Sequence, residues 1–402
     1  MSQYFSSENG IALNANWDSL HNMLDICLVY GLSLGTPTSA VKDVSGRVVL
    51  TFSAAHKVLL FQNVTLSGFF PAELNTDYQV IALTTSELTL APLDKRQITQ
   101  PTTIGSARLT PIGYDIAFTS ATCRVYRAKK PTSSHPFIRV DCATEKGGVT
   151  YNSSFARSAM VGLLENMTHI DDVENTHKQI PYSQSNPARN WEITREGDSV
   201  LRGESKWFWA TNDLISATGS FSERYNVTNG QEFSIAGDAD AVLMSIKPST
   251  GVVTFVYGWG GDMSQPSLDG ACLLSTCATT FWHTGNAVAP NSRGMPLVNS
   301  SNPDALFCNI NTLQTLRSKP LVFDHNSGRL NSLSNGYAHN FLFNVGGRLL
   351  NPIPKALYMG GDYSAMSSQT TVAVLDGEAI AILKCFTTSG VGGLGYMLGE
   401  AL

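Results

Sequence analysis

The densest patch of titratable side chains in the sequence contains His169, Asp171, Asp172 and His177. Imidazole and carboxylate groups are suitable ligands for divalent metal ions, so a metal site is one interpretation of this patch. The spacing of these residues matches no metal-binding signature, however, and the segment has the polar composition of a chain leaving a helix. We therefore expect neither a metal ion nor a cofactor.

A second group of candidate ligands includes Cys272 and Cys277, with His283 and Cys308 nearby in the sequence. Structural zinc sites combine two closely spaced pairs of ligands, and only one cysteine pair is present. A zinc site and a disulfide are therefore the weaker alternatives, and reduced thiols in a core of small residues are favoured. The chain has seven cysteines, which we interpret as free thiols made in a reducing cytoplasm.

Enzyme motifs with a fixed spacing do not occur in the sequence. The glycines of 258–262 and 392–395 lack the Lys-Ser/Thr pair of a phosphate-binding loop, and there is no Gly-x-Ser-x-Gly nucleophile motif. Two carboxylates for glycoside cleavage need no local spacing, so that reaction stays open. The nearest candidates, all in turn-like segments where aspartate is favoured, are Asp238, Asp240, Asp262 and Asp269. We expect a protein that is not an enzyme.

Aromatic residues provide the remaining candidate contacts. Trp207 and Trp209 flank a phenylalanine, and Trp282 follows another. Such rings can stack on the sugar faces of a glycan or fill an interface with a partner protein. The alternative is packing in the core, because aromatic side chains are abundant there as well.

The composition limits the classes of partner. Charged residues make up only 15% of the chain, below the roughly 25% typical of soluble domains. Because charge is depleted at the centres of interfaces, this indicates a subunit whose surfaces are covered by other molecules. A net charge of −5 without a basic stripe argues against nucleic-acid binding. The sequence contains no apolar stretch long enough to span a membrane, and its first 16 residues do not resemble a secretory signal.

Hydrophobic periodicity predicts the elements that would position these residues. One amphipathic helix is indicated by Leu13, Trp17, Leu20, Leu24, Cys27 and Leu28, with Gly31 at its end. A second, short helix is indicated by Ala156, Met160, Leu163 and Met167. Short β-type runs fill 46–127 and the chain beyond 190, with hairpins at 242–257 and 372–383. The glycine-rich segment 389–395 is expected to be extended or to dock on a neighbour.

These elements predict an α+β fold with predominantly antiparallel β structure. A small N-terminal α+β module with one amphipathic helix is expected over 1–128, followed by a larger, sandwich-like β-rich module over 129–402. A further division of the second module near 185–190 is an alternative. The boundary is placed at Lys129–Pro136, where two prolines, two serines and a basic pair indicate a linker or exposed loop.

The stretch Leu20–Leu32 resembles the opening helix of tailed-bacteriophage virion proteins, in which an apolar helix ending in Leu-Val-x-Gly precedes alternating strands. Further stretches similar to that group follow in order: Pro111–Tyr114 with Phe118, Val125–Arg127, Ile138–Asp141, Ala156–Arg157, Glu165–Thr168, Asp171–Asp172 and Ala188–Ile193. The resemblance covers about residues 10 to 210 and more loosely the hairpins up to 386, whereas 263–311 departs from it. It implies a structural role and offers no active-site residues to transfer.

Resemblance and composition together predict a non-enzymatic structural component of a bacteriophage virion, made in the cytoplasm of the bacterial host. The tail tip, the baseplate and the tail-fibre attachment region are the expected positions. The expected partners are other tail or baseplate proteins and further copies of the chain, as a trimer or hexamer. A tail protein that attaches to a host-surface glycan is the alternative, and an enzyme that degrades envelope glycan is a third reading.

Overall fold

The computed structural model describes residues 2–402 except 153, 175–177, 184, 212–229, 248–253, 263, 266, 279–305, 310–314, 319–335, 341, 346–347, 352, 362–368, 376–377 and 389–391. Antiparallel sheets dominate, with 48% strand and 10% helix. This confirms the predicted α+β fold class with predominantly antiparallel β structure. Within the described residues, no helix is long and apolar enough to cross a membrane.

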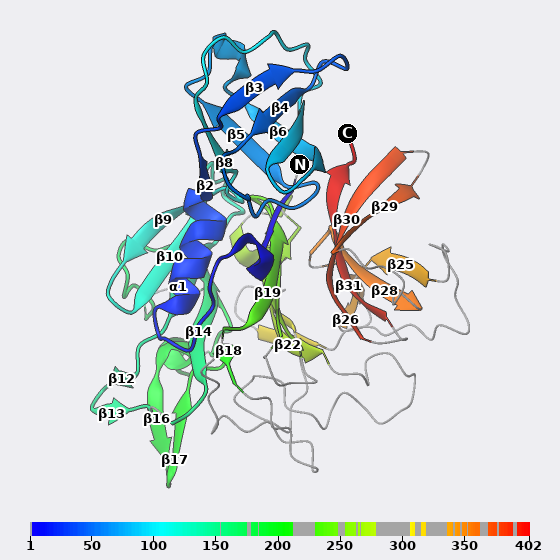
Figure 1. Ribbon diagram of the computed structural model, residues 1–402. Helices are drawn as coiled ribbons and strands as arrows, with labels where there is room; N and C mark the ends of the chain where they lie inside the picture. Colours follow the sequence, from blue (N-terminus) through cyan, green and yellow to red (C-terminus); the bar gives the residue numbers. More distant parts are fainter. Residues whose placement is uncertain are drawn as a thin grey trace.

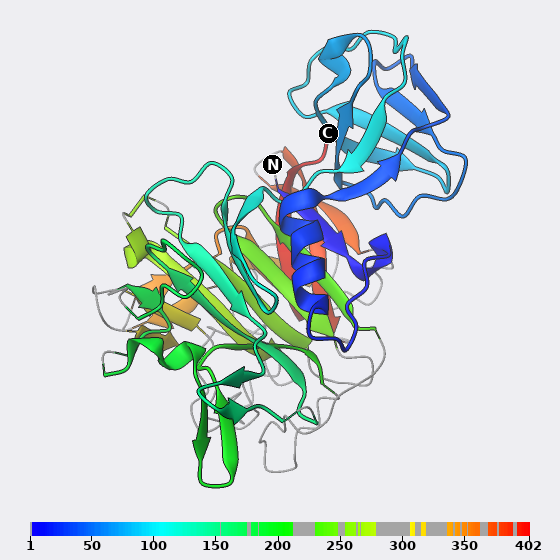
Figure 2. The same cartoon turned by 90° about the vertical axis from the view of Figure 1, so that its left-hand side faces the viewer.

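The barrel-like unit, residues 32–109, is a curled seven-stranded sheet that projects from the rest of the chain (Figures 1 and 2). Its strands pair in the order β2-β8-β5-β6-β7-β4-β3. On β4, Val48 and Leu50 point into the core and the residues after each are half-buried, as a two-residue repeat requires. The elements are β2 (Leu32–Gly35), β3 (Ser39–Lys42), β4 (Val48–Thr51), β5 (Asn63–Ser67), η3 (Ala72–Leu74), β6 (Asp77–Leu83), β7 (Glu87–Pro92) and β8 (Ser106–Leu109).

The predicted N-terminal helix is present but begins later than its apolar repeat. It consists of α1 (Ser19–Leu24), which continues as the π-helical η2 (Asp25–Tyr30). Gly31 ends it with a φ of 67°, and a side chain there would collide with the carbonyl oxygen of Leu109. The repeat therefore identifies the buried face and the C-terminal end of the helix, whereas Leu13 and Trp17 lie before its first turn.

His21 anchors this helix to the neighbouring sheet. Its side chain is buried, and its Nε2 lies 3.1 Å from the carbonyl oxygen of Val140, to which only an N–H can donate. Burial lowers the pKa of His21, and the hydrogen bond to the Val140 carbonyl offsets only part of that effect. The imidazole is thus held neutral in the folded protein.

We expect the free energy of unfolding to fall as the pH drops below about 6.5, the unfolded value for histidine. The unfolded chain then binds a proton that folded His21 does not, so the loss reaches at most about 1.4 kcal/mol per pH unit. Urea titrations between pH 5 and pH 8 measure the slope of the free energy of unfolding against pH. His21→Gln should flatten it and the control variant His56→Gln should not; equal slopes in both variants would contradict this role.

The central six-stranded sheet follows the barrel-like unit. Its path is β15-β14-β11-β10-β9, with β18 paired to β14. Strands β10 and β11, on either side of the predicted boundary at residue 128, are hydrogen-bonded, and Lys129–Pro136 is the loop of their hairpin. The strands are β9 (Tyr114–Thr119), β10 (Cys123–Ala128), β11 (Phe137–Asp141), β14 (Arg157–Leu164), β15 (Gln179–Ile180) and β18 (Lys206–Ala210).

The predicted second helix is wrong, since its residues form strand β14 and the loop after it. Seven of the eight residues of β14 are buried. One face of the strand packs in the core that contains the N-terminal helix, and the other face packs in the cluster that contains Trp191. The indole of Trp191 is so close that a Cβ on Gly162 would lie 2.8 Å from it. A strand buried on both faces has an unbroken apolar sequence, which periodicity cannot distinguish from a buried helix.

A seven-stranded sheet, in the order β1-β19-β20-β21-β22-β23-β24, forms the middle layer. Tyr257 of β21 donates and accepts hydrogen bonds at the backbone of Phe208 in the six-stranded sheet. On the opposite face, Ser234 and Ser245 donate to the carbonyl oxygen of Cys385. The strands are β1 (Gln3–Ser6), β19 (Glu232–Gly237), β20 (Val242–Lys247), β21 (Thr254–Gly261), β22 (Ala271–Ala278), β23 (Leu306–Asn309) and β24 (Thr315–Ser318).

The C-terminal five-stranded sheet, in the order β25-β28-β31-β30-β29, supplies the third layer. The two predicted hairpins are confirmed, since β20 pairs with β21 and β29 with β30. Of the glycine-rich segment, residues 392–395 belong to β31 and pair with β28 and β30 of the same chain. The strands are β25 (Gly336–Asn340), β28 (Ala356–Gly361), β29 (Thr370–Leu375), β30 (Glu378–Thr388) and β31 (Gly392–Glu400).

Small elements complete the described part of the chain. They are the hairpins β12 (Glu145–Lys146) with β13 (Val149–Thr150), β16 (Ile193–Glu196) with β17 (Ser199–Arg202) and β26 (Phe343–Val345) with β27 (Arg348–Leu350), and the 3-10 turns η1 (Ser7–Asn9), η4 (Pro187–Trp191) and η5 (Ser267–Gly270). The β16–β17 hairpin extends away from the stacked sheets (Figure 1).

Candidate functional site

Two of the three tryptophans selected from the sequence lie in the core. Trp207 is fully buried on β18 and stacks on Tyr257, with ring centroids 5.0 Å apart. Trp209 is also fully buried; it meets Trp17 edge to face and donates a hydrogen bond from Nε1 to the carbonyl oxygen of Asn14. The structure thus places both rings between layers, as the core-packing alternative requires, and presents neither to a glycan or a partner. Trp282 lies outside the described residues.

The titratable patch near the end of β14 is not assembled around a common point. Asp172 accepts hydrogen bonds from the backbone and hydroxyl of Thr168, and Asp171 lies 3.5 Å from Arg139. His177 lies outside the described residues. In the part of the chain that the structure describes, no three His, Cys, Asp or Glu side chains are grouped to hold a metal ion.

The cysteine pair of the sequence is separated by strand geometry. Cys272 and Cys277 both lie on β22, and five positions along a strand separate their Cα atoms by about 17 Å. They therefore do not share a metal ion or a disulfide, and Cys272 stands opposite Cys308 in the register instead. Burial raises the pKa of Cys123 and Cys385 to about 12, so these two thiols are poor nucleophiles.

The four aspartates considered for catalysis have structural partners. Asp238 accepts hydrogen bonds from Ser2 and Lys355, which tie the middle sheet to the C-terminal sheet. Burial works to raise the pKa of Asp238, but these donors prevail and hold it below its usual range. Asp240 contacts the His135 ring at 3.0 Å, and Asp269 lies 3.5 Å from Lys178. Asp262 accepts from the backbone and hydroxyl of Ser264, as in a turn.

A cleft of about 300 Å³ beside η4 holds two glutamates that the sequence did not reveal. Asn186 donates to Glu192 Oε2 at 3.0 Å, and Arg189 donates to Glu204 Oε1 at 3.0 Å. Two carboxyl groups therefore lie in one cleft, and each accepts a hydrogen bond from a side-chain nitrogen of the η4 segment.

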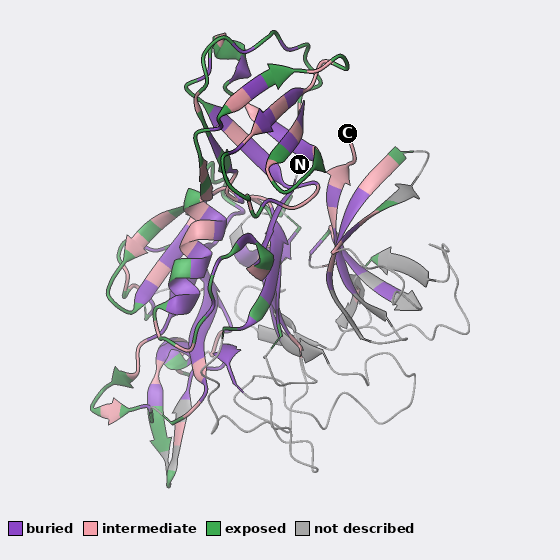
Figure 3. Cartoon of the chain, in the orientation of Figure 1, coloured by how far each residue is buried: buried purple, intermediate pink, exposed green. Residues whose placement is uncertain are grey.

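Exposed apolar side chains gather on one part of the molecule. Seven large ones are exposed among the described residues, and only Val372 lies on the C-terminal sheet. The other six, which we call the exposed apolar set, are Tyr30, Val41, Val44, Phe70, Leu83 and Ile104. They lie on the barrel-like unit or at its entry, which Figure 3 shows with many exposed residues. Single apolar residues are normal on a protein surface, whereas large exposed apolar patches are typical of interaction sites.

Phe70 and Ile104 are close neighbours within this set. The backbone of Phe70 bonds to that of Thr103, and the Phe70 side chain is 59% exposed. Phe70 follows the C-terminal end of β5, and Ile104 precedes the N-terminal end of β8. The opposite end of β5 faces the N-terminal strand β1, because Asn63 there is hydrogen-bonded to Gln3. An exposed aromatic ring therefore occupies the free end of the projecting unit.

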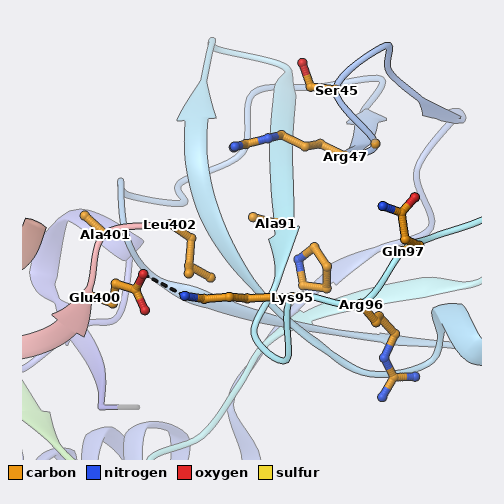
Figure 4. A pocket seen from close by; sticks show the side chains of 11 residues that line it. Ser45, Arg47, Ala91, Lys95, Arg96, Gln97, Glu400, Ala401 and Leu402 are labelled. Atoms are coloured by element: carbon orange, nitrogen blue, oxygen red, sulfur yellow. Dashed lines mark hydrogen bonds and ion pairs between the residues drawn. The ribbon is translucent and has the colours of Figure 1, made fainter. Parts of the chain in front are cut away.

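The second cleft, of about 370 Å³, lies between the barrel-like unit and the end of β31 (Figure 4). Lys95 forms an ion pair across it with Glu400, at 2.8 Å. Arg47 lines the same cleft, and within the described chain its guanidinium makes no hydrogen bond or ion pair. No local sequence pattern predicts this site, because Lys95 and Glu400 are 305 residues apart.

Comparison with known proteins adds no relative. No family model matches the chain, and no curated protein is similar to it.

Proposed function

We propose that this chain is a non-enzymatic structural component of a bacteriophage virion, located in the tail tip, baseplate or tail-fibre attachment region. It acts through protein–protein interfaces, with the barrel-like unit as the part that docks. The observation that carries this proposal is the exposed apolar set, five large side chains on one projecting unit and a sixth, Tyr30, at its entry. Such patches mark surfaces that other proteins cover.

The low charge content supports the same role. Only 15% of the residues are charged, and uncharged polar groups can pair across an interface without the desolvation cost of buried ions. The stacked sheets are also joined by buried aromatic contacts such as Trp207 on Tyr257, which gives a rigid base for the projecting unit. A rigid scaffold with an apolar contact surface suits repeated assembly in a symmetric particle.

Charge placed on the exposed apolar set should prevent incorporation into particles. Two double variants test this in the phage that encodes the chain: Phe70→Asp with Ile104→Asp, and Val41→Asp with Val44→Asp. We expect at least one of them to be incorporated about tenfold or more below the wild type, because a charge in an apolar interface is left unpaired. Quantitative mass spectrometry of purified particles measures incorporation.

Val372→Asp is the matched control, since Val372 is a similarly exposed apolar residue on the other sheet. It should be incorporated normally. All of these surface variants should fold, with free energies of unfolding within about 0.5 kcal/mol of the wild type per substitution. Normal incorporation of both double variants would contradict the assignment of this surface.

A further inference from the structure

The cleft between the barrel-like unit and β31 concentrates positive charge on an acidic protein. The chain has a net charge of −5, yet Arg47, Lys95 and Arg96 line this one cleft. Arg96 is paired with Asp94 and Lys95 with Glu400. Arg47 is the cation that the described residues leave without a counter-charge, so the cleft can take one more anionic group.

The internal ion pair shows that this cleft accepts a carboxylate. Glu400 Oε1 lies 2.8 Å from the Lys95 ammonium (Figure 4), and the buried Ala91 and Pro92 also line the cleft. Arg47 extends along the opposite side of the cleft, and its planar guanidinium can bind both oxygens of a second carboxylate. Val44, which precedes the lining residue Ser45, is fully exposed, so an apolar side chain is available one residue away from the cleft lining.

The lining distinguishes between classes of anionic ligand. None of the eleven described residues that line the cleft is aromatic, so a sugar ring would find no stacking surface there. A nucleic acid would require a row of unpaired cations along its phosphates, whereas only Arg47 is unpaired in this cleft. A short peptide with an acidic residue next to an apolar one matches both the guanidinium and Val44.

We propose that this cleft binds an acidic segment of a neighbouring protein chain, with Arg47 receiving its carboxylate. The inference rests on the proposed assembly role and names the chemistry of one partner contact. Val44 belongs to the exposed apolar set and precedes Ser45, a residue that lines the cleft.

An array of immobilised hexapeptides tests the proposal with the full-length protein. Each acidic peptide, with Asp or Glu beside Leu or Val, is printed next to its amide twin, in which Asn or Gln replaces the acid. We expect the acidic peptides to bind about tenfold more strongly than their twins, and the difference to shrink at high salt. Arg47→Glu should abolish this preference and Arg47→Lys should retain part of it.

Arg195→Glu is the matched control, because Arg195 is exposed on the distant β16–β17 hairpin. It should bind the acidic peptides like the wild type. Equal binding of acidic and amide peptides, absence of binding to any peptide, or unchanged binding by Arg47→Glu would each overturn the proposal. The proposed function fails by a different result, absence of the chain from particles, so the two outcomes are separable.

Discussion

Replacing Trp207 by alanine is expected to lower the free energy of unfolding by about 3–5 kcal/mol. The indole is fully buried on β18 and stacks on both Tyr257 and Trp259 of the middle sheet, with centroid distances of 5.0 and 6.0 Å. Its removal leaves a cavity between two sheets that neither can close alone. Chemical denaturation followed by far-ultraviolet circular dichroism measures the change.

Trp207→Phe separates the loss of volume from the loss of an aromatic face. Phenylalanine keeps a ring on Tyr257, so this variant should lose clearly less stability than the alanine variant. Tyr30→Ala serves as the surface control, because Tyr30 is 54% exposed and should cost little. If Trp207→Ala unfolded at the wild-type denaturant concentration but failed to bind a glycan, the ring would have a contact role and not a packing role.

Removal of the Arg139 guanidinium is expected to lower the free energy of unfolding by about 3–5 kcal/mol, because the buried Asp141 carboxylate is then left without its partner. Arg139 Nη1 donates to Asp141 Oδ2 at 2.7 Å, and both side chains are less than one-tenth exposed. The same guanidinium donates to the carbonyl oxygen of Ile170 and lies over the ring of Trp191. We expect Arg139→Met to show this loss in denaturant titrations.

A double-mutant cycle identifies the cause. Asp141→Asn removes the charge that Arg139→Met leaves unpaired, so the double variant should be more stable than Arg139→Met alone. Arg189→Met provides a control, since Arg189 also pairs with a buried carboxylate but is itself 57% exposed. Additive losses in the double variant would mean that Arg139 acts through packing on Trp191 and not through its charge.

Local sequence patterns predicted the elements that are polar on one face or end at a defined turn. Gly31 ends the helix because the chain needs a positive φ beside Leu109, and the β29–β30 hairpin follows from apolar runs on both sides of a turn. Strand β14 was predicted as a helix because burial on both faces erases the two-residue alternation. The segment Lys129–Pro136 has the composition of a linker or exposed loop, and it is the loop of the β10–β11 hairpin.

The candidate site depends on contacts that are distant in sequence. Arg47 and Glu400 reach one cleft only because β31 returns to the barrel-like unit, where Gln79 donates to the carbonyl oxygen of Glu400. Likewise, nothing in the local sequence separates Trp207, which is buried between sheets, from an exposed ring such as Phe70. The low charge content predicted that other molecules cover the surfaces of this chain. Only the fold shows where the exposed apolar set lies.

The most direct test of the assembly role is the copy number of this chain in purified phage particles, measured by quantitative mass spectrometry against labelled reference peptides. We expect the chain to be present in several copies per particle, in a multiple of three or six, and lysine cross-linking to join Lys42 of the barrel-like unit to another chain. Particles that lack the chain would contradict the assembly role, as would a chain that performs its biological role as a solitary monomer.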